Sequence, residues 1–434
     1  MDAATPGRGW LLRLVITFSC AQSAVSMARP AVSYRALALG ADERAVGVIT
    51  AVYALLPLLV AVPLGRRTDH GRCAPLLAAG VALITGGCAL SGVAGSLPAM
   101  AAWSGVMGLG HLCFVIGAQS IVARRSAPGE RDRNFGHFTI GASLGQLVGP
   151  AAAGLLVSGH ADAMAATSAT ALLVSGALAA LSYGSLWRLE HGQDPGGAGR
   201  GAVRQSRTQA AAPPPSVRGI LRTRGVAAGI FMSLAVLSAT DILTAYLPVI
   251  GEARGVAPAT VGLLLSLRAA ATVACRLVMT PLIRLLGRTA LMAGSSALAG
   301  LLCAGLTLPA PVWAMAVMLA ALGFCLGVGQ PLSMTTVVQA APEAARSTAL
   351  ALRLTGNRLG QVAAPATAGL LAGLAGTAAP FAMLGALLLV SAATAARTEN
   401  RNPGPPHPER TGGGPEDTPR PPLSAPGDGT RATR

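Results

Sequence analysis

The chain alternates long apolar runs with short polar segments rich in arginine, glycine and proline. A membrane-spanning helix needs about 20 predominantly apolar residues, because it rises about 1.5 Å per residue through a hydrocarbon core about 30 Å thick. About twelve runs meet this requirement, so the pattern predicts twelve membrane helices. The predicted spans lie near residues 10–36, 45–64, 74–93, 97–122, 135–157, 163–187, 224–250, 257–282, 289–307, 311–338, 346–372 and 378–396.

Composition agrees with a chain that lies mostly in lipid. Of its 434 residues, 52% are hydrophobic and only 12% are charged, and the mean hydropathy is +0.56. These values exclude an ordinary soluble domain. Residues 1–23 resemble a secretory signal in length, but Arg13 interrupts their apolar stretch and hydrophobicity continues past Ser23. We therefore expect a first helix that is retained.

Polar segments divide the chain into two groups of spans. We expect an N-terminal six-helix half over residues 10–188 and a C-terminal half over 223–396. Residues 189–222, rich in glycine, proline, arginine and glutamine, are predicted to form a linker between them. Residues 1–9 form a short N-terminal segment, and 397–434 have the composition of a disordered tail.

The distribution of arginine predicts the orientation. All 33 basic residues are arginines, and the formal net charge is +16. A pI of 11.2 would suit a nucleic-acid partner, but the arginines alternate from loop to loop instead of forming one binding face. With the N-terminus inside, 17 arginines fall in cytoplasmic loops and three (Arg35, Arg44 and Arg254) in external loops. This positive-inside bias predicts a multi-pass protein of the cell membrane with both termini in the cytoplasm.

An internal repeat relates the two halves. A Gly-Gln pair, a proline and a Gly-Leu-Leu triplet occur in both with the same spacing, shifted by 215 residues. They begin at Gly145, Pro150 and Gly154 in the first half and at Gly360, Pro365 and Gly369 in the second. The fifth predicted helix therefore corresponds to the eleventh, and the first to the seventh. Two equivalent halves of this kind are typical of membrane carriers.

Two glycine-containing motifs can be located relative to the predicted helices, one in a loop and one within a helix. They comprise Gly65, Asp69, Gly71 and Arg72 between the second and third spans, and Gly136, Gly145, Gly149, Pro150 and Gly154 in the fifth. These sets resemble the loop signature and the antiporter-type helix 5 signature of the major facilitator superfamily. The first is one residue short, with His70 where a basic residue is usual, and Ala153 replaces one glycine of the second. Ser104 occupies the place of an arginine in the helix 4 signature.

The resemblance implies a fold and a mechanism. The implied fold is an all-α integral membrane protein, in which two six-helix bundles related by pseudo-two-fold symmetry surround a central cavity, and the implied mechanism is alternating access. The helix 5 glycines would let that helix slide against helix 8 of the other half; the alternative is a static packing face. Asp69 would hold the halves shut at the cytoplasmic face, near Arg346 and Ser347. The alternative is a solvated loop acid.

Polar side chains at membrane depth are the candidates for substrate binding or coupling, because they are costly to place there. Arg353, Asn357 and Gln361 recur every four residues and share one face of the eleventh helix. For Arg276, Arg353 and Arg358 the alternative is that the side chain reaches the membrane interface. The candidates are Arg29, His111, Asp241, Arg268, Arg276, Gln330, Arg353, Asn357, Arg358 and Gln361.

Alignment of the first and seventh helices on Tyr34 and Tyr246 places Arg29 opposite Asp241. In the superfamily these two helices face each other, so we expect the two charges to pair when the outer side is closed. Asp241 is then the candidate for the coupling proton. The alternative is a permanent pair between Asp241 and Arg268.

Embedded arginines outnumber embedded carboxylates, so the cavity should favour an anionic or neutral solute. The hypothesis is therefore a proton-linked secondary transporter of a small organic anion. Export is favoured, and import by proton symport is the alternative. A non-transporting sensor or a polytopic membrane enzyme is the alternative from another class, although no catalytic pair is evident. Seven cysteines without a CxxC pair indicate neither a metal nor a disulfide framework, and no cofactor is expected. The expected partners are solute, protons and the bilayer, with no nucleic acid, and the protein is expected to be monomeric.

Overall fold

The computed structural model describes residues 9–70, 74–126, 130–190, 217–223, 225–342 and 346–400. Over these residues it is entirely helical, without strands. The first half contains α1 (Gly9–Ala38), α2 (Glu43–His70), α3 (Ala74–Val93), α4 (Leu97–Arg125), α5 (Arg131–Leu156) and α6 (Ala161–Glu190). The second contains α8 (Val217–Arg222), α9 (Val226–Ala253), α10 (Pro258–Leu277), α11 (Met279–Leu286), α12 (Arg288–Gly305), α13 (Val312–Ala340), α14 (Arg346–Ala375) and α15 (Ala379–Asn400).

Every predicted span coincides with a long helix. Ten helices are long and apolar enough to cross a membrane. Helices α11 and α12 are bent by 106° relative to each other, and they add an eleventh span if the pair crosses the membrane as one. The helix outside this set is α14, whose apolar sequence is interrupted by Arg353, Asn357, Arg358 and Gln361. Polar residues on a buried helix are tolerated where they face protein or a wet cavity. The short helices α8 and α11 were not predicted.

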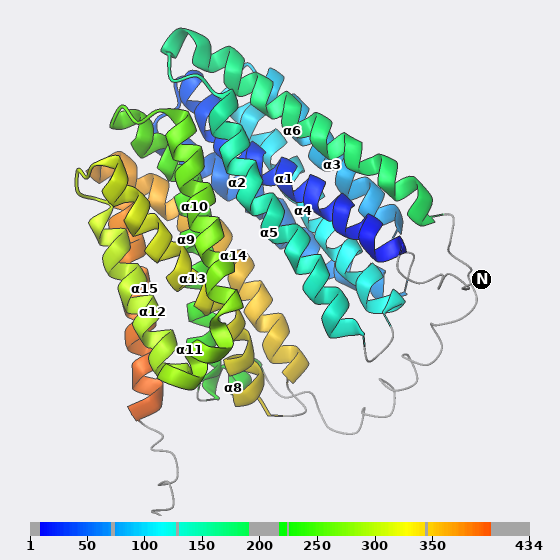
Figure 1. Ribbon diagram of the computed structural model, residues 1–434, viewed down its shortest axis with the longest axis vertical. Coiled ribbons are helices and arrows are strands. Elements are labelled where there is room, and N and C mark those ends of the chain that lie inside the picture. Colours follow the sequence, from blue (N-terminus) through cyan, green and yellow to red (C-terminus); the bar gives the residue numbers. More distant parts are fainter. Residues whose placement is uncertain are drawn as a thin grey trace, which may run out of the picture.

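Two bundles lie side by side (Figure 1). One contains α1–α6, and the other contains the six long helices α9, α10, α12, α13, α14 and α15 together with the short α11. Within the first bundle α1 packs on α5 and α6, and within the second α9 packs on α14 and α15. Between the bundles α2 packs on α14, and its repeat-equivalent α10 packs on α5. These equivalent pairs show the pseudo-two-fold symmetry that the internal repeat predicts.

The halves are held together near the end of the molecule where α2 and α10 begin, which we call the closed end. There the Tyr246 hydroxyl of α9 donates to the Glu43 carbonyl oxygen at 2.9 Å, and Arg44 Nη2 donates to the Gly373 carbonyl oxygen at 3.1 Å. Deeper along the interface, the Ala151 N–H donates to Ser266 Oγ at 3.1 Å. The bundles spread apart toward the opposite end, where α8 and α11 lie (Figure 1). We call this the linker end.

Glycines allow the closest approach between the halves. A Cβ added to Gly47 of α2 would lie 2.7 Å from the Gly369 Cα of α14. On the other side of the interface, a Cβ added to Gly154 of α5 would lie 3.0 Å from the Gly262 Cα of α10. Real Cβ atoms do not approach this closely, so the two interfaces need glycine where the helices cross.

The expected helix 5 ridge is divided between two neighbours. Only Gly154, together with the Pro150 carbonyl oxygen, faces α10 of the other half. Gly145 and Gly149 pack instead on α1 of their own half, and no described atom outside the helix backbone lies within 4 Å of a Cβ at Gly136. The expectation that the whole ridge contacts the other half was therefore wrong, because these positions lie on different faces of α5.

Each bundle is also fastened internally at the closed end. Arg35, near the end of α1, donates to the Ala165 and Ala94 carbonyl oxygens, each at 2.9 Å. Arg254, just after the equivalent α9, donates to the Leu306 and Thr307 carbonyl oxygens at 2.9 and 3.1 Å. Partial burial lowers the pKa of the Arg254 guanidinium, and the two carbonyls offset that desolvation. The two arginines thus join α1 to α3 and α6, and α9 to the end of α12.

Candidate substrate and coupling site

An ion pair joins the two halves in the interior. Arg29 Nη2 of α1 lies 2.7 Å from Asp241 Oδ1 of α9, and the side chains are only 19% and 7% exposed. Both residues lie in the part of their helices nearer the closed end. The predicted contact between Arg29 and Asp241 is therefore confirmed. A charged group buried at this depth needs a partner of opposite charge, and here each supplies it to the other.

Helix α14 contributes a second contact to the Asp241 carboxylate. Gln361 Nε2 donates to Asp241 Oδ2 at 2.9 Å, so both carboxylate oxygens are engaged. Arg358 Nη1 in turn donates to Gln361 Oε1 at 3.0 Å. Three predicted residues from three helices thus meet at one carboxylate, and Arg358 is tied to it through an amide.

Arg268 of α10 interacts electrostatically with the same carboxylate without forming an ion pair with it among the described residues. Its side chain is buried, with 7% exposure, and its position couples it electrostatically to both Arg29 and Asp241. In the described residues it forms no ion pair, and its buried Nε has no hydrogen-bond partner. In this conformation Asp241 is therefore paired with Arg29, and not with Arg268.

A series of polar contacts connects Arg29 to other helices of the first half. The Arg29 guanidinium lies 5.3 Å from the centre of the Tyr53 ring, within cation–π range. The Tyr53 hydroxyl lies 2.8 Å from His111 Nδ1, and His111 Nε2 lies 3.1 Å from Gln22 Oε1. Gln22 Nε2 donates to Ser26 Oγ at 3.3 Å, which leaves Gln22 Oε1 as an acceptor. This assigns the proton to His111 Nε2, and Tyr53 then donates to Nδ1.

Sequence reasoning found His111 but missed its partners. Tyr53, Gln22 and Ser26 lie in apolar helices, and which face of such a helix turns inward is not evident without its neighbours. The available signals were an amide inside the first apolar run and the scarcity of tyrosine, of which the chain has four.

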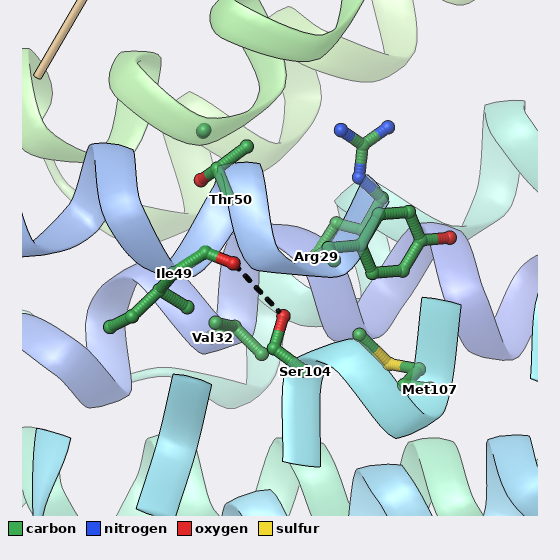
Figure 2. Close-up of a pocket in the computed structure, with 8 residues that line it drawn as sticks. Arg29, Val32, Ile49, Thr50, Ser104 and Met107 are labelled. Carbon is green, nitrogen blue, oxygen red and sulfur yellow. Dashed lines mark hydrogen bonds between the residues drawn. The ribbon is translucent and has the colours of Figure 1, made fainter. Parts of the chain in front are cut away.

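A small pocket lies beside Arg29, with a volume of about 20 Å³, room for about one water molecule. Figure 2 shows Ser104 and Met107 of α4 on one side, with the Arg29 guanidinium pointing away from them. Ser104 Oγ donates to the Ile49 carbonyl oxygen at 3.3 Å (Figure 2). Ser104, at the position of the arginine in the helix 4 signature, is therefore a neutral, buried residue that lines the pocket.

The polar face of α14 serves two clusters. Arg353 Nη2 donates to Gln330 Oε1 at 2.8 Å and to the Gln330 carbonyl oxygen at 3.1 Å, while Gln330 Nε2 donates to the Ser233 carbonyl oxygen at 2.9 Å. Arg353 is 6% exposed, which contradicts the alternative that it reaches the membrane interface. Asn357 is equally buried, and its Oδ1 has no hydrogen-bond partner among the described residues. The hydrogen bonds of Arg353, Gln330 and Ser233 hold α9, α13 and α14 together, separately from the Asp241 cluster.

The loop signature lies largely outside the described residues. Helix α2 continues through Gly65 and Asp69 to His70, but the described side chains do not include these positions. Gly71 and Arg72 lie outside the described ranges, and the side chains of Arg346 and Ser347 are not described. The gating role of Asp69 stays a prediction.

The fold and this interior site define a membrane carrier built from two equivalent halves. The sequence profile of the Major Facilitator Superfamily matches residues 14–257 and 230–427, and the chain belongs to this family. A search of curated protein sequences finds no match. Membership of this family points to a membrane transporter.

Solved structures support the same fold. A point mutant of the nucleoside transporter NupG has a TM-score of 0.74 at 13% identity, covering 90% of this chain and 100% of that one. A POT family transporter in complex with 5-aminolevulinic acid also has a TM-score of 0.74, at 14% identity over 92% and 97% of the two chains. A point mutant of the peptide transporter POT has a TM-score of 0.71 at 16% identity over 90% and 94%. At such identities the likeness concerns the fold alone.

Proposed function

We propose that this protein is a proton-linked secondary transporter that moves a small organic anion by alternating access. The observation that carries the proposal is the ion pair between Arg29 and Asp241, because it joins the two halves in the interior and can be broken by one proton. In the described parts of the two halves, the other hydrogen bonds between them also lie on the closed-end side of the molecule. Breaking these contacts would let the closed end open.

Asp241 is the best candidate for the coupling group. Among the described side chains it is the only buried carboxylate. Arg29 and Gln361 contact its two carboxylate oxygens, and a proton there would remove the attraction that holds α1 to α9. A proton on Asp241 would therefore lower the stability of the closed end and release Arg29.

The charge of the site supports an anionic solute. Arg29, Arg268 and Arg358 surround Asp241, so guanidinium groups exceed carboxylates. A planar guanidinium binds a carboxylate through two parallel hydrogen bonds. A cation would meet repulsion in the same place.

The arginine-rich loops support a cytoplasmic linker end, so the observed conformation would face inward. The helix 5 signature supports export, with protons entering as the anion leaves. A second candidate is import by proton symport, which is favoured by the neutral Ser104 where the antiporter signature has an arginine.

Reconstitution of the full chain tests this function. Proteoliposomes loaded with a pH-sensitive dye receive a series of small carboxylates under an imposed pH gradient, with protein-free vesicles as the control for passive permeation. We expect carboxylate-dependent proton movement with the wild-type protein and none with Asp241→Asn. The direction of the pH gradient that drives accumulation distinguishes antiport from symport. Carboxylate transport without proton movement would overturn the coupling, and transport of cations alone would overturn the solute class.

A further inference from the structure

The charges at the interior site do not balance. Three guanidinium groups, those of Arg29, Arg268 and Arg358, interact with one carboxylate, that of Asp241. The other acidic residues within the described ranges do not compensate, because each lies at or beside a helix end. With Asp241 ionised, the site therefore carries two unmatched positive charges.

The contacts identify which guanidinium groups are unmatched. Arg29 is neutralised directly by Asp241 at 2.7 Å. Among the described residues, Arg358 has a hydrogen bond only to the neutral amide of Gln361 at 3.0 Å, and Arg268 has no partner for its side chain. Arg268 is also more than nine-tenths buried, so bulk water does not compensate its charge. An unpaired charge in such a place is expensive, and an incoming anion removes the cost.

We propose that the solute is a small dicarboxylate, which places one carboxylate on Arg268 of α10 and the other on Arg358 of α14. This assignment rests on the proposed function and narrows its solute class from organic anions to dianions. Two carboxylates match the two unmatched charges, and each finds a planar guanidinium that can bind it through two hydrogen bonds. A monocarboxylate leaves one of the two guanidinium groups unpaired.

The same charge could come from a phosphate group, but its two charges are on one centre. Arg268 and Arg358 project from different helices, which suits two separated anionic groups better than one. Inorganic phosphate is therefore included as a competitor, because it distinguishes a single doubly charged group from two separate carboxylates.

Equilibrium binding to the purified full-length protein tests the proposal. Radiolabelled succinate is the probe, and unlabelled malonate, glutarate, propionate and inorganic phosphate are the competitors. We expect the dicarboxylates to compete at concentrations at least about tenfold lower than propionate or phosphate, because a hydrogen-bonded ion pair is lost in each comparison. Arg268→Gln and Arg358→Gln should each weaken succinate binding about tenfold or more and remove most of the preference over propionate.

The matched control is Arg284→Gln, at an exposed position of α11 outside the site. It should keep the wild-type preference. Propionate or phosphate competing as well as succinate, or an unchanged preference in the Arg268 and Arg358 variants, would overturn the dicarboxylate assignment. If either variant fails to fold, the competition series with the wild-type protein still tests the dicarboxylate assignment. Transport of monocarboxylates with proton movement would support the proposed function even if the dicarboxylate assignment fails. The absence of any anion transport would contradict both proposals.

Discussion

Gly154 of α5 and Gly262 of α10 pack backbone against backbone across the two halves, and a Cβ on either one would lie 3.0 Å from the Cα of the other. The same arrangement recurs between Gly47 and Gly369 on the symmetry-related interface. The closed end therefore depends on four positions without side chains. Larger residues there should act on the equilibrium between conformations, because each half can remain folded while the contact between them opens.

Substitution of Gly262 by valine should shift the protein toward a conformation that is open at the closed end. The branched side chain overlaps the Gly154 backbone and the Pro150 carbonyl oxygen, which belong to the other half. A cysteine introduced at Glu43, on a background without native cysteines, should then react several-fold faster with a membrane-impermeant maleimide. Gly136→Val is the control, because among the described residues no atom outside the α5 backbone lies within 4 Å of that Cβ. Equal labelling of both variants would exclude the glycine contact as a determinant of closure.

Neutralising Asp241 should separate proton coupling from solute exchange. In Asp241→Asn the amide can still accept from Gln361, but it neither carries a proton nor attracts Arg29. We expect proton-driven accumulation to fall at least tenfold and exchange of labelled for unlabelled solute to continue. The double variant Arg29→Asp with Asp241→Arg should close the outer side better than either single change, as measured by maleimide labelling. If the double variant is no better and Arg268→Ala has the effect of Asp241→Asn, the coupling pair is Asp241 with Arg268.

Much of the fold was predictable because the bilayer fixes the length of a span. The apolar runs located all twelve long helices, and the repeat placed Arg29 opposite Asp241. The break at Val278 between α10 and α11 was not predictable, since hydrophobicity continues through it. The direction in which a side chain points was the other limit. Gly145 and Gly149 carry the family spacing, yet they face α1, and only the packing of the helices shows this.

Removing either carbonyl-binding arginine should destabilise its own half. Arg35→Ala leaves the carbonyls at Ala94 and Ala165 without their donor, and Arg254→Ala does the same at Leu306 and Thr307. Hydrogen bonds from a charged donor contribute about 1.5–3 kcal/mol each, so we expect a fall of several degrees in the melting temperature in detergent. Arg284→Ala, at an exposed position of α11, is the control. An unchanged melting temperature in both variants would contradict the fastening role.

The Tyr53 ring and its hydroxyl should contribute separately to the site. Tyr53→Phe keeps the ring 5.3 Å from the Arg29 guanidinium but removes the hydroxyl that donates to His111 Nδ1, whereas Tyr53→Leu removes both. A partly buried cation–π contact is worth about 0.5–2 kcal/mol, so the leucine variant should bind solute about two- to thirtyfold more weakly than the phenylalanine variant. His111→Gln removes the imidazole nitrogen that accepts from Tyr53. Combined with Tyr53→Phe it should add little further loss, because both changes remove the same hydrogen bond. Fully additive losses in this double-mutant cycle, measured by solute affinity, would show that His111 does not act through Tyr53.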